Sequence, residues 1–180
     1  MAGAAIRRAG ESEVDDLVGL LLRANDEHLR SFPPAVASGY REELERLPEL
    51  LPRDAEVFVA DMGGRATGMM AFLPDASADA HVWPPGGSVL RFLAVEPTAR
   101  GAGLGRTLVS FCVDRARALD VRYLGLHTAP SMQAARHLYE RLGFVRDEQL
   151  DFDPGGHYAA EAGESRWGLA YVLHFPVVEA

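Results

Sequence analysis

The sequence predicts a mixed α/β (α+β) fold: a mostly antiparallel central sheet flanked by helices, with one β-α-β unit in its middle. Three observations predict it. Apolar segments with strand patterning alternate with segments of helical periodicity. The segment Asp61-Met62-Gly63-Gly64-Arg65 is typical of a hairpin turn, because glycine readily adopts positive φ. A glycine-rich loop joins an apolar strand directly to a long helix.

The first part of the chain is predicted to be a short strand followed by two amphipathic helices. Ala5–Ala9 is the strand, and Ser12-Glu13-Val14-Asp15 fits a capping pattern in which Ser12 begins the first helix. The apolar face of this helix consists of Val14, Leu17, Val18, Leu21 and Leu22. Ser31-Phe32-Pro33-Pro34 then breaks the chain. The second helix has an apolar face of Val36, Tyr40, Leu44 and Leu47, and it ends at Pro48 and Pro52.

The middle of the chain is predicted to contain three strands and a long helix. Glu56–Ala60 and Thr67–Leu73 flank the hairpin turn, and Val89–Val95 follows a loop over residues 74–88. The helix begins after the glycine-rich loop, and its apolar stripe consists of Leu104, Leu108, Phe111, Cys112 and Leu119.

The last part of the chain is predicted to return to the sheet. Tyr123–Thr128 is a strand, and a helix follows that Ser131 caps and Gly143 ends. Phe144–Phe152 and Trp167–Phe175 are the remaining strands. The loop between them, residues 153–165, is expected to form either a lid or acceptor wall or a disordered segment.

The segment from Val89 to Leu119 is the most informative about function. A helix start presents about four unpaired backbone N–H groups and the positive end of the helix dipole. Glycines at positions 101, 103 and 105 precede or begin this helix, and they let a ligand approach the backbone closely. The pattern predicts either a phosphate or pyrophosphate cradle or a tight turn whose glycines serve packing alone. The dinucleotide fingerprint G-x-G-x-x-G does not fit the glycine spacing.

Two motifs together resemble the GNAT superfamily of N-acetyltransferases. Arg100-x-x-Gly103-x-Gly105 matches its R/Q-x-x-G-x-G/A acetyl-CoA signature, and the segment from Leu138 to Phe144 is similar to its L-Y-x-x-x-G-F ending. The predicted element order matches that of the superfamily along nearly the whole chain. The resemblance implies that acetyl-CoA, or another acyl-CoA, binds at the central β-α-β unit. It also implies transfer of the acetyl group to a primary amine by direct attack in a ternary complex.

The resemblance also implies where the cofactor binds. Backbone groups of the strand before the signature would pair with the pantetheine arm, and N–H groups from Gly101 through Arg106 would hold the pyrophosphate. Many relatives have asparagine at the position of Met132, whose side chain cannot donate a hydrogen bond. The implied cofactor-binding residues are Leu93, Ala94, Val95, Arg100, Gly101, Ala102, Gly103, Leu104, Gly105, Arg106, Met132 and Ala135.

The resemblance implies two catalytic residues, Tyr139 and His127. Tyr139 corresponds to the tyrosine that protonates the departing thiolate in many relatives, or it merely packs against the cofactor. His127 occupies the position of the glutamate base in ribosomal-protein N-acetyltransferases, and an imidazole with an unperturbed pKa of about 6.5 suits a base. A strand histidine with a structural role is the alternative. The glutamate base of some histone-modifying relatives is absent, because Val89 occupies that position.

The acceptor is expected to be a small-molecule amine or a protein N-terminus. Phe32-Pro33-Pro34 lies where relatives shape the acceptor pocket, and the 153–165 loop adds three further candidates: His157, Glu161 and Glu164. Arg91 interrupts an apolar strand, so it either binds an acidic group of the acceptor or pairs with a nearby carboxylate. A non-catalytic acyl-CoA-binding or regulatory domain on the same fold is the alternative function.

Composition excludes several other classes of protein. The net charge of −8 argues against a nucleic-acid partner, and all 18 basic residues are arginines, so a standard P-loop and a lysine Schiff base are excluded. Cys112 is the single cysteine, which excludes an internal disulfide and favours the cytoplasm. We expect no metal site, since no histidine spacing fits one, and no membrane helix. The length of 180 residues predicts a single domain over residues 1–180, as a monomer or homodimer.

Overall fold

A computed structural model of the chain describes residues 4–79, 83–152 and 168–176. Its centre is a seven-stranded sheet in the order β1-β2-β3-β4-β5-β7-β6. Among the described strands only β4 and β5 pair in parallel, and the other pairs are antiparallel. The strands are β1 Ala5–Arg8, β2 Glu56–Met62, β3 Arg65–Leu73, β4 Ser88–Val95, β5 Tyr123–Thr128, β6 Val145–Arg146 and β7 Leu169–His174. The mostly antiparallel sheet and the β4-α4-β5 unit confirm the predicted fold class.

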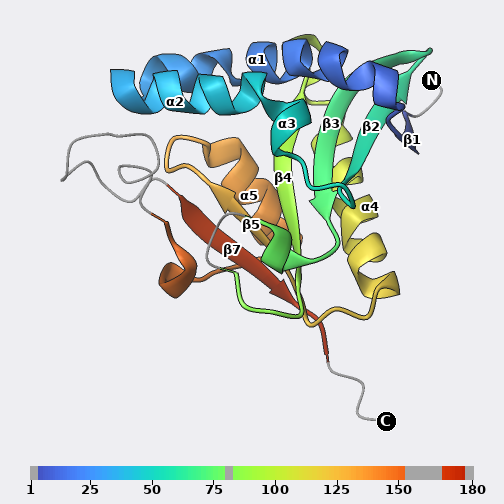
Figure 1. Cartoon of the computed structure of the whole chain (residues 1–180), viewed down its shortest axis with the longest axis vertical. Helices are drawn as coiled ribbons and strands as arrows, with labels where there is room; N and C mark the ends of the chain where they lie inside the picture. The colour runs from blue at the N-terminus through green and yellow to red at the C-terminus, as the bar shows by residue number, and fades with distance from the viewer. Residues whose placement is uncertain (1–3, 80–82, 153–167, 177–180) are drawn as a thin grey trace.

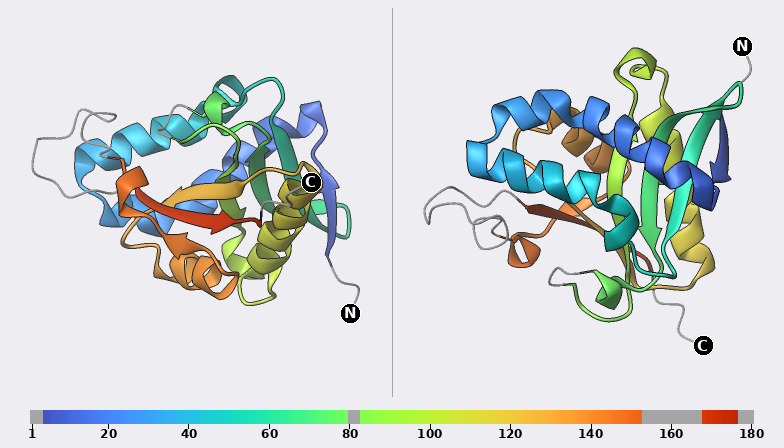
Figure 2. Two further views of the ribbon diagram at one scale, coloured as in Figure 1. Left: turned by 90° about the horizontal axis from the view of Figure 1, so that it is seen from below. Right: turned by 45° about the horizontal axis from the view of Figure 1, so that its top comes forward.

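Helices cover both faces of this sheet (Figures 1 and 2). Of the described α-helices, two long ones and a one-turn helix lie on one face, and two lie on the other. The helices of the first face are α1 Val14–Ser31, α2 Pro34–Glu45 and α3 Leu47–Leu50, and those of the second are α4 Leu104–Ala118 and α5 Gln133–Arg141. The result is a three-layer arrangement with the sheet in the middle.

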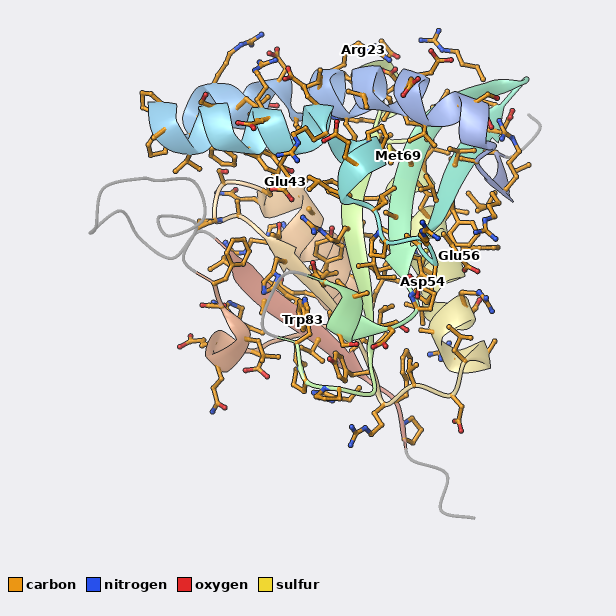
Figure 3. The ribbon with its side chains drawn as sticks, in the orientation of Figure 1. Arg23, Glu43, Asp54, Glu56, Met69 and Trp83 are labelled. Carbon is orange, nitrogen blue, oxygen red and sulfur yellow. The ribbon has the colours of Figure 1, made fainter. Side chains whose placement is uncertain are left out.

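Each face of the sheet has its own apolar core. On the first face, leucines of α1 such as Leu17 and Leu21 pack against β2 and β3 together with Met69, which Figure 3 marks. On the second face, Leu108 and Cys112 of α4 pack with Leu126 and Phe144. Successive residues of a strand point to opposite faces, so each central strand contributes to both cores.

β4 carries an irregularity at its centre. Phe92 has a φ of +58°, which non-glycine residues rarely adopt, and the pairing of β4 with β3 shifts register at this point. The parallel ladder between β4 and β5 covers Ser88–Leu90 and Leu124–Leu126. Among the described residues no pair between these two strands follows it. The two strands therefore separate beyond Leu90, and a split opens in the sheet.

The predicted capping residues of two helices are wrong. α1 begins at Val14 after a one-turn 3-10 helix, and its N-cap is Glu13, whose Oε2 accepts a hydrogen bond from Gly10 N–H at 2.8 Å. This hydrogen bond fixes the chain at the start of α1, whereas the sequence predicts that Ser12 caps this helix. α5 begins at Gln133 with Met132 as its N-cap and no side-chain capping bond.

Near the start of α5, backbone carbonyl groups accept hydrogen bonds from the N–H groups that a capping Ser131 side chain would bind. Met132 N–H donates to Ala129 O at 3.0 Å, and Gln133 N–H donates to Ser131 O at 2.9 Å. Ser131 therefore does not cap the helix. Gly143 ends α5 as predicted, with a φ of +90°.

Two further predictions need correction. The strand predicted at Phe144–Phe152 is only β6, because Asp147 accepts a hydrogen bond from Gln149 N–H at 3.1 Å and opens a short 3-10 turn. Two residues of the stripe predicted for α4 are only partly buried, since Phe111 is 38% and Leu119 36% exposed, although the Phe111 ring is 4.8 Å from that of the core residue Phe58. The loop predicted over residues 153–165, with its candidates His157, Glu161 and Glu164, lies outside the described residues.

Candidate active site

A cavity of about 120 Å³ lies where β4 and β5 separate. Its lining comes from both faces of the sheet: from the end of α1 and from α2 on one face, and from the β5–α5 connection on the other. Aromatic side chains supply much of the wall, namely Phe32, Tyr40, Phe92 and Phe152. Polar groups are few, and they are supplied by Glu43, Asp79, Arg91, His127 and Thr128. Such a cavity, mainly apolar with a few polar groups, is typical of a ligand site.

The polar wall on the α2 side is a chain of charged groups centred on Arg91. The guanidinium of Arg91 pairs with Glu43 of α2 and donates to Asp79 Oδ1 at 3.0 Å. Trp83 Nε1–H donates to the other oxygen of Asp79 at 2.8 Å. Glu43 and Trp83 are marked in Figure 3, with Glu43 on the side of α2 that faces the sheet. Arg91 therefore pairs with carboxylates, the second of the two predicted alternatives, and two carboxylates surround one guanidinium.

His127 lies beside this network, near the end of β5. Its ring is 4.5 Å from the ring of Trp83 and 4.8 Å from that of Phe152, measured between centroids. Its Nε2 is 2.8 Å from Leu150 O, so Nε2 carries the proton and donates it. Burial lowers the pKa of His127 below its ordinary value of 6.5 and outweighs the opposing effect of this hydrogen bond. The imidazole is thus neutral at pH 7, as a general base must be.

The glycine loop leads into α4 at the far end of β4. Gly101 and Gly103 have φ values of +83° and +81°, and Gly103 is the N-cap of α4. A Cβ added to either glycine would meet no atom within 4 Å, so the loop presents an open surface. The first N–H groups of α4 have no partner within the helix. A loop of this kind suits an anionic group such as a phosphate.

The two arginines of the motif differ in their surroundings. The guanidinium of Arg100 donates to Ala24 O of α1 at 2.7 Å and lies 3.8 Å from Glu27 Oε2, so it joins the loop to α1. Arg106 is exposed on the first turn of α4, next to the glycine loop.

Tyr139 lies on α5, on the second face of the sheet. It is 5% exposed and packs near Phe144 and Tyr171, with ring centroids 5.9 Å and 6.4 Å away. Burial raises the pKa of Tyr139, so its hydroxyl keeps its proton at neutral pH. Tyr139 is not part of the cavity lining, whereas Met132 is. Ala135, one turn before Tyr139, packs against the same core.

Sequence reasoning missed several residues of the cavity. Glu43 belongs to the charged run Arg41-Glu42-Glu43, which is typical of an exposed helix surface, and only the fold buries it. Thr128 ends an apolar strand and is 7% exposed. Its Oγ1 is buried without a hydrogen-bond partner in the part of the chain that the structure describes.

Comparison with known protein families identifies the family of this chain. The model of the acetyltransferase (GNAT) family matches residues 21–144, which contain both the glycine loop and Tyr139. The chain belongs to the GNAT family. Members of this family are acyl-CoA-dependent N-acetyltransferases, so the protein is an enzyme of this kind and acetyl-CoA is its cofactor.

Individual GNAT proteins resemble the chain over most of its length. An "IAA acetyltransferase" of Azospirillum brasilense is 29% identical over 153 residues, which are 85% of this chain and 90% of the relative. The structure of yncA, a putative acetyltransferase of Salmonella typhimurium with its cofactor acetyl-CoA, has a TM-score of 0.64 at 18% identity and covers 99% of this chain and 98% of its own. The ribosomal-protein-S18-alanine N-acetyltransferase of Escherichia coli has a TM-score of 0.65 at 18% identity, with 98% and 95% covered.

The residues of this chain fit acetyl-CoA. The open loop at Gly101 and Gly103 is suited to a pyrophosphate, and the edge of β4 beyond Leu90 makes no ladder with β5. Among the described residues no three His, Cys, Asp or Glu side chains are grouped to hold a metal ion. Over residues 4–79, 83–152 and 168–176, no helix combines the length and apolar character needed to cross a membrane.

Proposed function

We propose that this GNAT enzyme acetylates a primary amine by direct attack within a ternary complex, with residues 1–180 acting as a single domain. The observation that carries the proposal is the cavity at the β4–β5 split, which is lined from both faces of the sheet. A group held along the split on one face can therefore meet an acceptor held on the other. No covalent acyl-enzyme is needed, and Cys112, the single cysteine, is buried in the core with a pKa raised to about 12.

The cofactor is proposed to lie along the open edge of β4. Backbone groups of Leu93 and Val95 bind the pantetheine arm in the manner of an added strand, and Ala94 between them pairs with Met69 of β3. The N–H groups from Gly101 through Arg106 bind the pyrophosphate, supported by the positive end of the α4 dipole. Met132 and Ala135 supply apolar contacts. The bound cofactor supplies an activated acyl thioester.

Two side chains of the chain are proposed to move the protons of the reaction. His127, neutral because of burial, accepts a proton from the acceptor ammonium on the α1/α2 face. Tyr139, whose hydroxyl is protonated because burial raises its pKa, donates a proton to the leaving sulfur from the α5 face. The nitrogen loses a second proton as the amide forms, and this proton balances the one that Tyr139 gives to the sulfur. The two groups lie on opposite faces of the sheet, as proton removal at the acceptor and proton delivery at the donor require.

The acceptor is proposed to be an amine on a compact apolar body. Phe32, Tyr40 and Phe92 supply the apolar wall of the cavity, and its charged groups include Glu43, Asp79 and Arg91, which are joined in ion pairs. An apolar wall of this kind favours an acceptor whose amine is attached to a small apolar group. A small-molecule amine or the first residue of a protein N-terminus meets this description.

The experiment is an assay of free-thiol release from acetyl-CoA with a panel of amines that includes small apolar amines and short peptides. We expect amine-dependent turnover in the wild type. In Tyr139→Phe, kcat is expected to fall about 100-fold, because the leaving sulfur loses its proton donor. Isothermal titration with acetyl-CoA checks that this variant still binds the cofactor.

Two results would count against the proposal. Equal turnover of Tyr139→Phe and the wild type would remove Tyr139 from the mechanism. Tight acetyl-CoA binding without turnover on any amine would favour a binding or regulatory role.

A further inference from the structure

The hydroxyl of Thr128 lacks a hydrogen-bond partner although it is buried. Thr128 is the last residue of β5 and is 7% exposed, and the structure gives its Oγ1 no partner among the described residues. Its backbone is fixed by pairing with Leu169 of β7. A buried hydroxyl without a partner costs free energy, so folded proteins rarely keep one without a reason. The side chain also lines the cavity at the β4–β5 split. A buried hydroxyl that lines a cavity and has no partner is suited to bind a polar atom of a ligand held there.

The position of Thr128 along the split indicates which part of a ligand it meets. The ladder between β4 and β5 ends at Leu90 and Leu126, and Thr128 is two residues beyond Leu126. The glycine loop, in contrast, follows the far end of β4 at Val95. Thr128 is thus at the closed end of the split, away from the loop proposed to bind the pyrophosphate.

The face of the sheet on which Thr128 lies also indicates which part of a bound acyl-CoA its hydroxyl meets. Leu124 and Leu126 belong to the core on the α4/α5 face, together with Tyr139. Alternation along the strand places the side chain of Thr128 on that same face, and that of His127 on the opposite one. The Thr128 hydroxyl is therefore on the side of the sheet proposed for the thioester, next to the cavity in which the acceptor is proposed to bind.

We propose that Thr128 is an acyl-binding residue: its hydroxyl donates a hydrogen bond to the carbonyl oxygen of the bound acyl thioester. This inference rests on the proposed function, because it needs an acyl-CoA in the split. A threonine hydroxyl has one proton to donate and can rotate to a carbonyl at the closed end. The hydrogen bond satisfies the buried hydroxyl and holds the carbonyl toward the acceptor cavity.

The test compares Thr128→Val, which keeps the shape of the side chain and removes the hydroxyl, with the wild type. Without ligand, Tm is expected to rise by about 2–4 °C, because an unpaired buried hydroxyl is removed. The Kd for acetyl-CoA, measured by isothermal titration, is expected to increase about threefold to tenfold. The Kd for CoA is expected to stay the same, since CoA lacks the acyl carbonyl. Thr128→Ser is expected to bind acetyl-CoA as the wild type does.

Thr67→Val is the matched control. The hydroxyl of Thr67 already donates to Ala60 O at 3.0 Å, so its removal is expected to lower Tm and to leave acetyl-CoA binding unchanged. The inference is overturned if Thr128→Val binds acetyl-CoA as tightly as the wild type. It is also overturned if the variant loses affinity for CoA and acetyl-CoA equally, because the contact would then be to the shared pantetheine. Failure of the wild type to bind acetyl-CoA would instead remove the proposed function, and this inference with it.

Discussion

His127 is held in one orientation by contacts on three sides. The rings of Trp83 and Phe152 pack against it, and Leu150 O accepts its Nε2 proton. Among the described residues, the carboxylates of Asp79 and Asp151 raise its pKa and the guanidinium of Arg91 lowers it, but burial has the largest effect. The neutral form is therefore favoured. With the proton on Nε2, the basic lone pair of the ring is on Nδ1.

At the residue scale, His127→Gln tests the proposed base. Because burial places the folded-state pKa of His127 below 6.5, the imidazole is neutral at pH 7 and becomes protonated only as the pH falls through that pKa. In the wild type, kcat at saturating amine is expected to be constant above this pKa and to decrease below it. In His127→Gln, kcat is expected to fall about 100-fold and to lose this acid limb.

The exposed His137 of α5 offers a control for this variant. His137→Gln is expected to keep both the wild-type kcat and its acid limb. An unchanged pH profile in His127→Gln would assign His127 a structural role only.

At the element scale, the start of α4 is the feature on which cofactor binding depends. Gly103 and the hairpin residue Gly63 both have positive φ, +81° and +66°, and a Cβ at either position meets nothing within 4 Å. Alanine at either site therefore introduces a similar backbone strain, about 1 kcal/mol, without a steric clash. The two glycines differ in one respect, since only Gly103 lies in the proposed pyrophosphate loop.

We expect Gly103→Ala and Gly63→Ala to lower the free energy of unfolding by similar amounts in denaturant titrations. Only Gly103→Ala is expected to weaken acetyl-CoA binding, by about tenfold, which is equivalent to about 1.4 kcal/mol. Isothermal titration measures this difference directly. Equal acetyl-CoA affinity in the two variants would show that the glycine loop serves helix packing alone.

Turns and helix ends that require glycine at a positive φ are predictable from the sequence. Gly63 and Gly64 form the hairpin turn and Gly143 ends α5, each with the positive φ that glycine permits. The capping residues are not predictable in the same way. A serine side chain caps a helix only if the first N–H groups of the helix have no other acceptor. Near Ser131, backbone carbonyl oxygens already accept hydrogen bonds from N–H groups at the start of α5. The start of α1 is tied down by Glu13, which also pairs with Arg7 of β1.

At the scale of the whole molecule, the family motif predicts the glycine loop and Tyr139, but the cavity depends on contacts between distant segments. Arg91 meets Glu43 of α2, 48 positions earlier in the chain, and the sequence alone left its partner open. The split between β4 and β5 follows from the backbone at Phe92, and a phenylalanine carries no sequence signal for positive φ. The unpaired hydroxyl of Thr128 is likewise visible only when the packing around it is known.

Thermal unfolding of the wild type with and without acetyl-CoA, with NADH and ATP as controls, tests the central claim most directly. At about 100 times its Kd, a ligand that binds only the folded state stabilises it by about 2.7 kcal/mol. For a chain of this length, this corresponds to a rise in Tm of roughly 5–10 °C. We expect that rise with acetyl-CoA and none with NADH or ATP. No rise at millimolar acetyl-CoA, or an equal rise with all three, would contradict acetyl-CoA binding at the split and the acetyltransferase mechanism built on it.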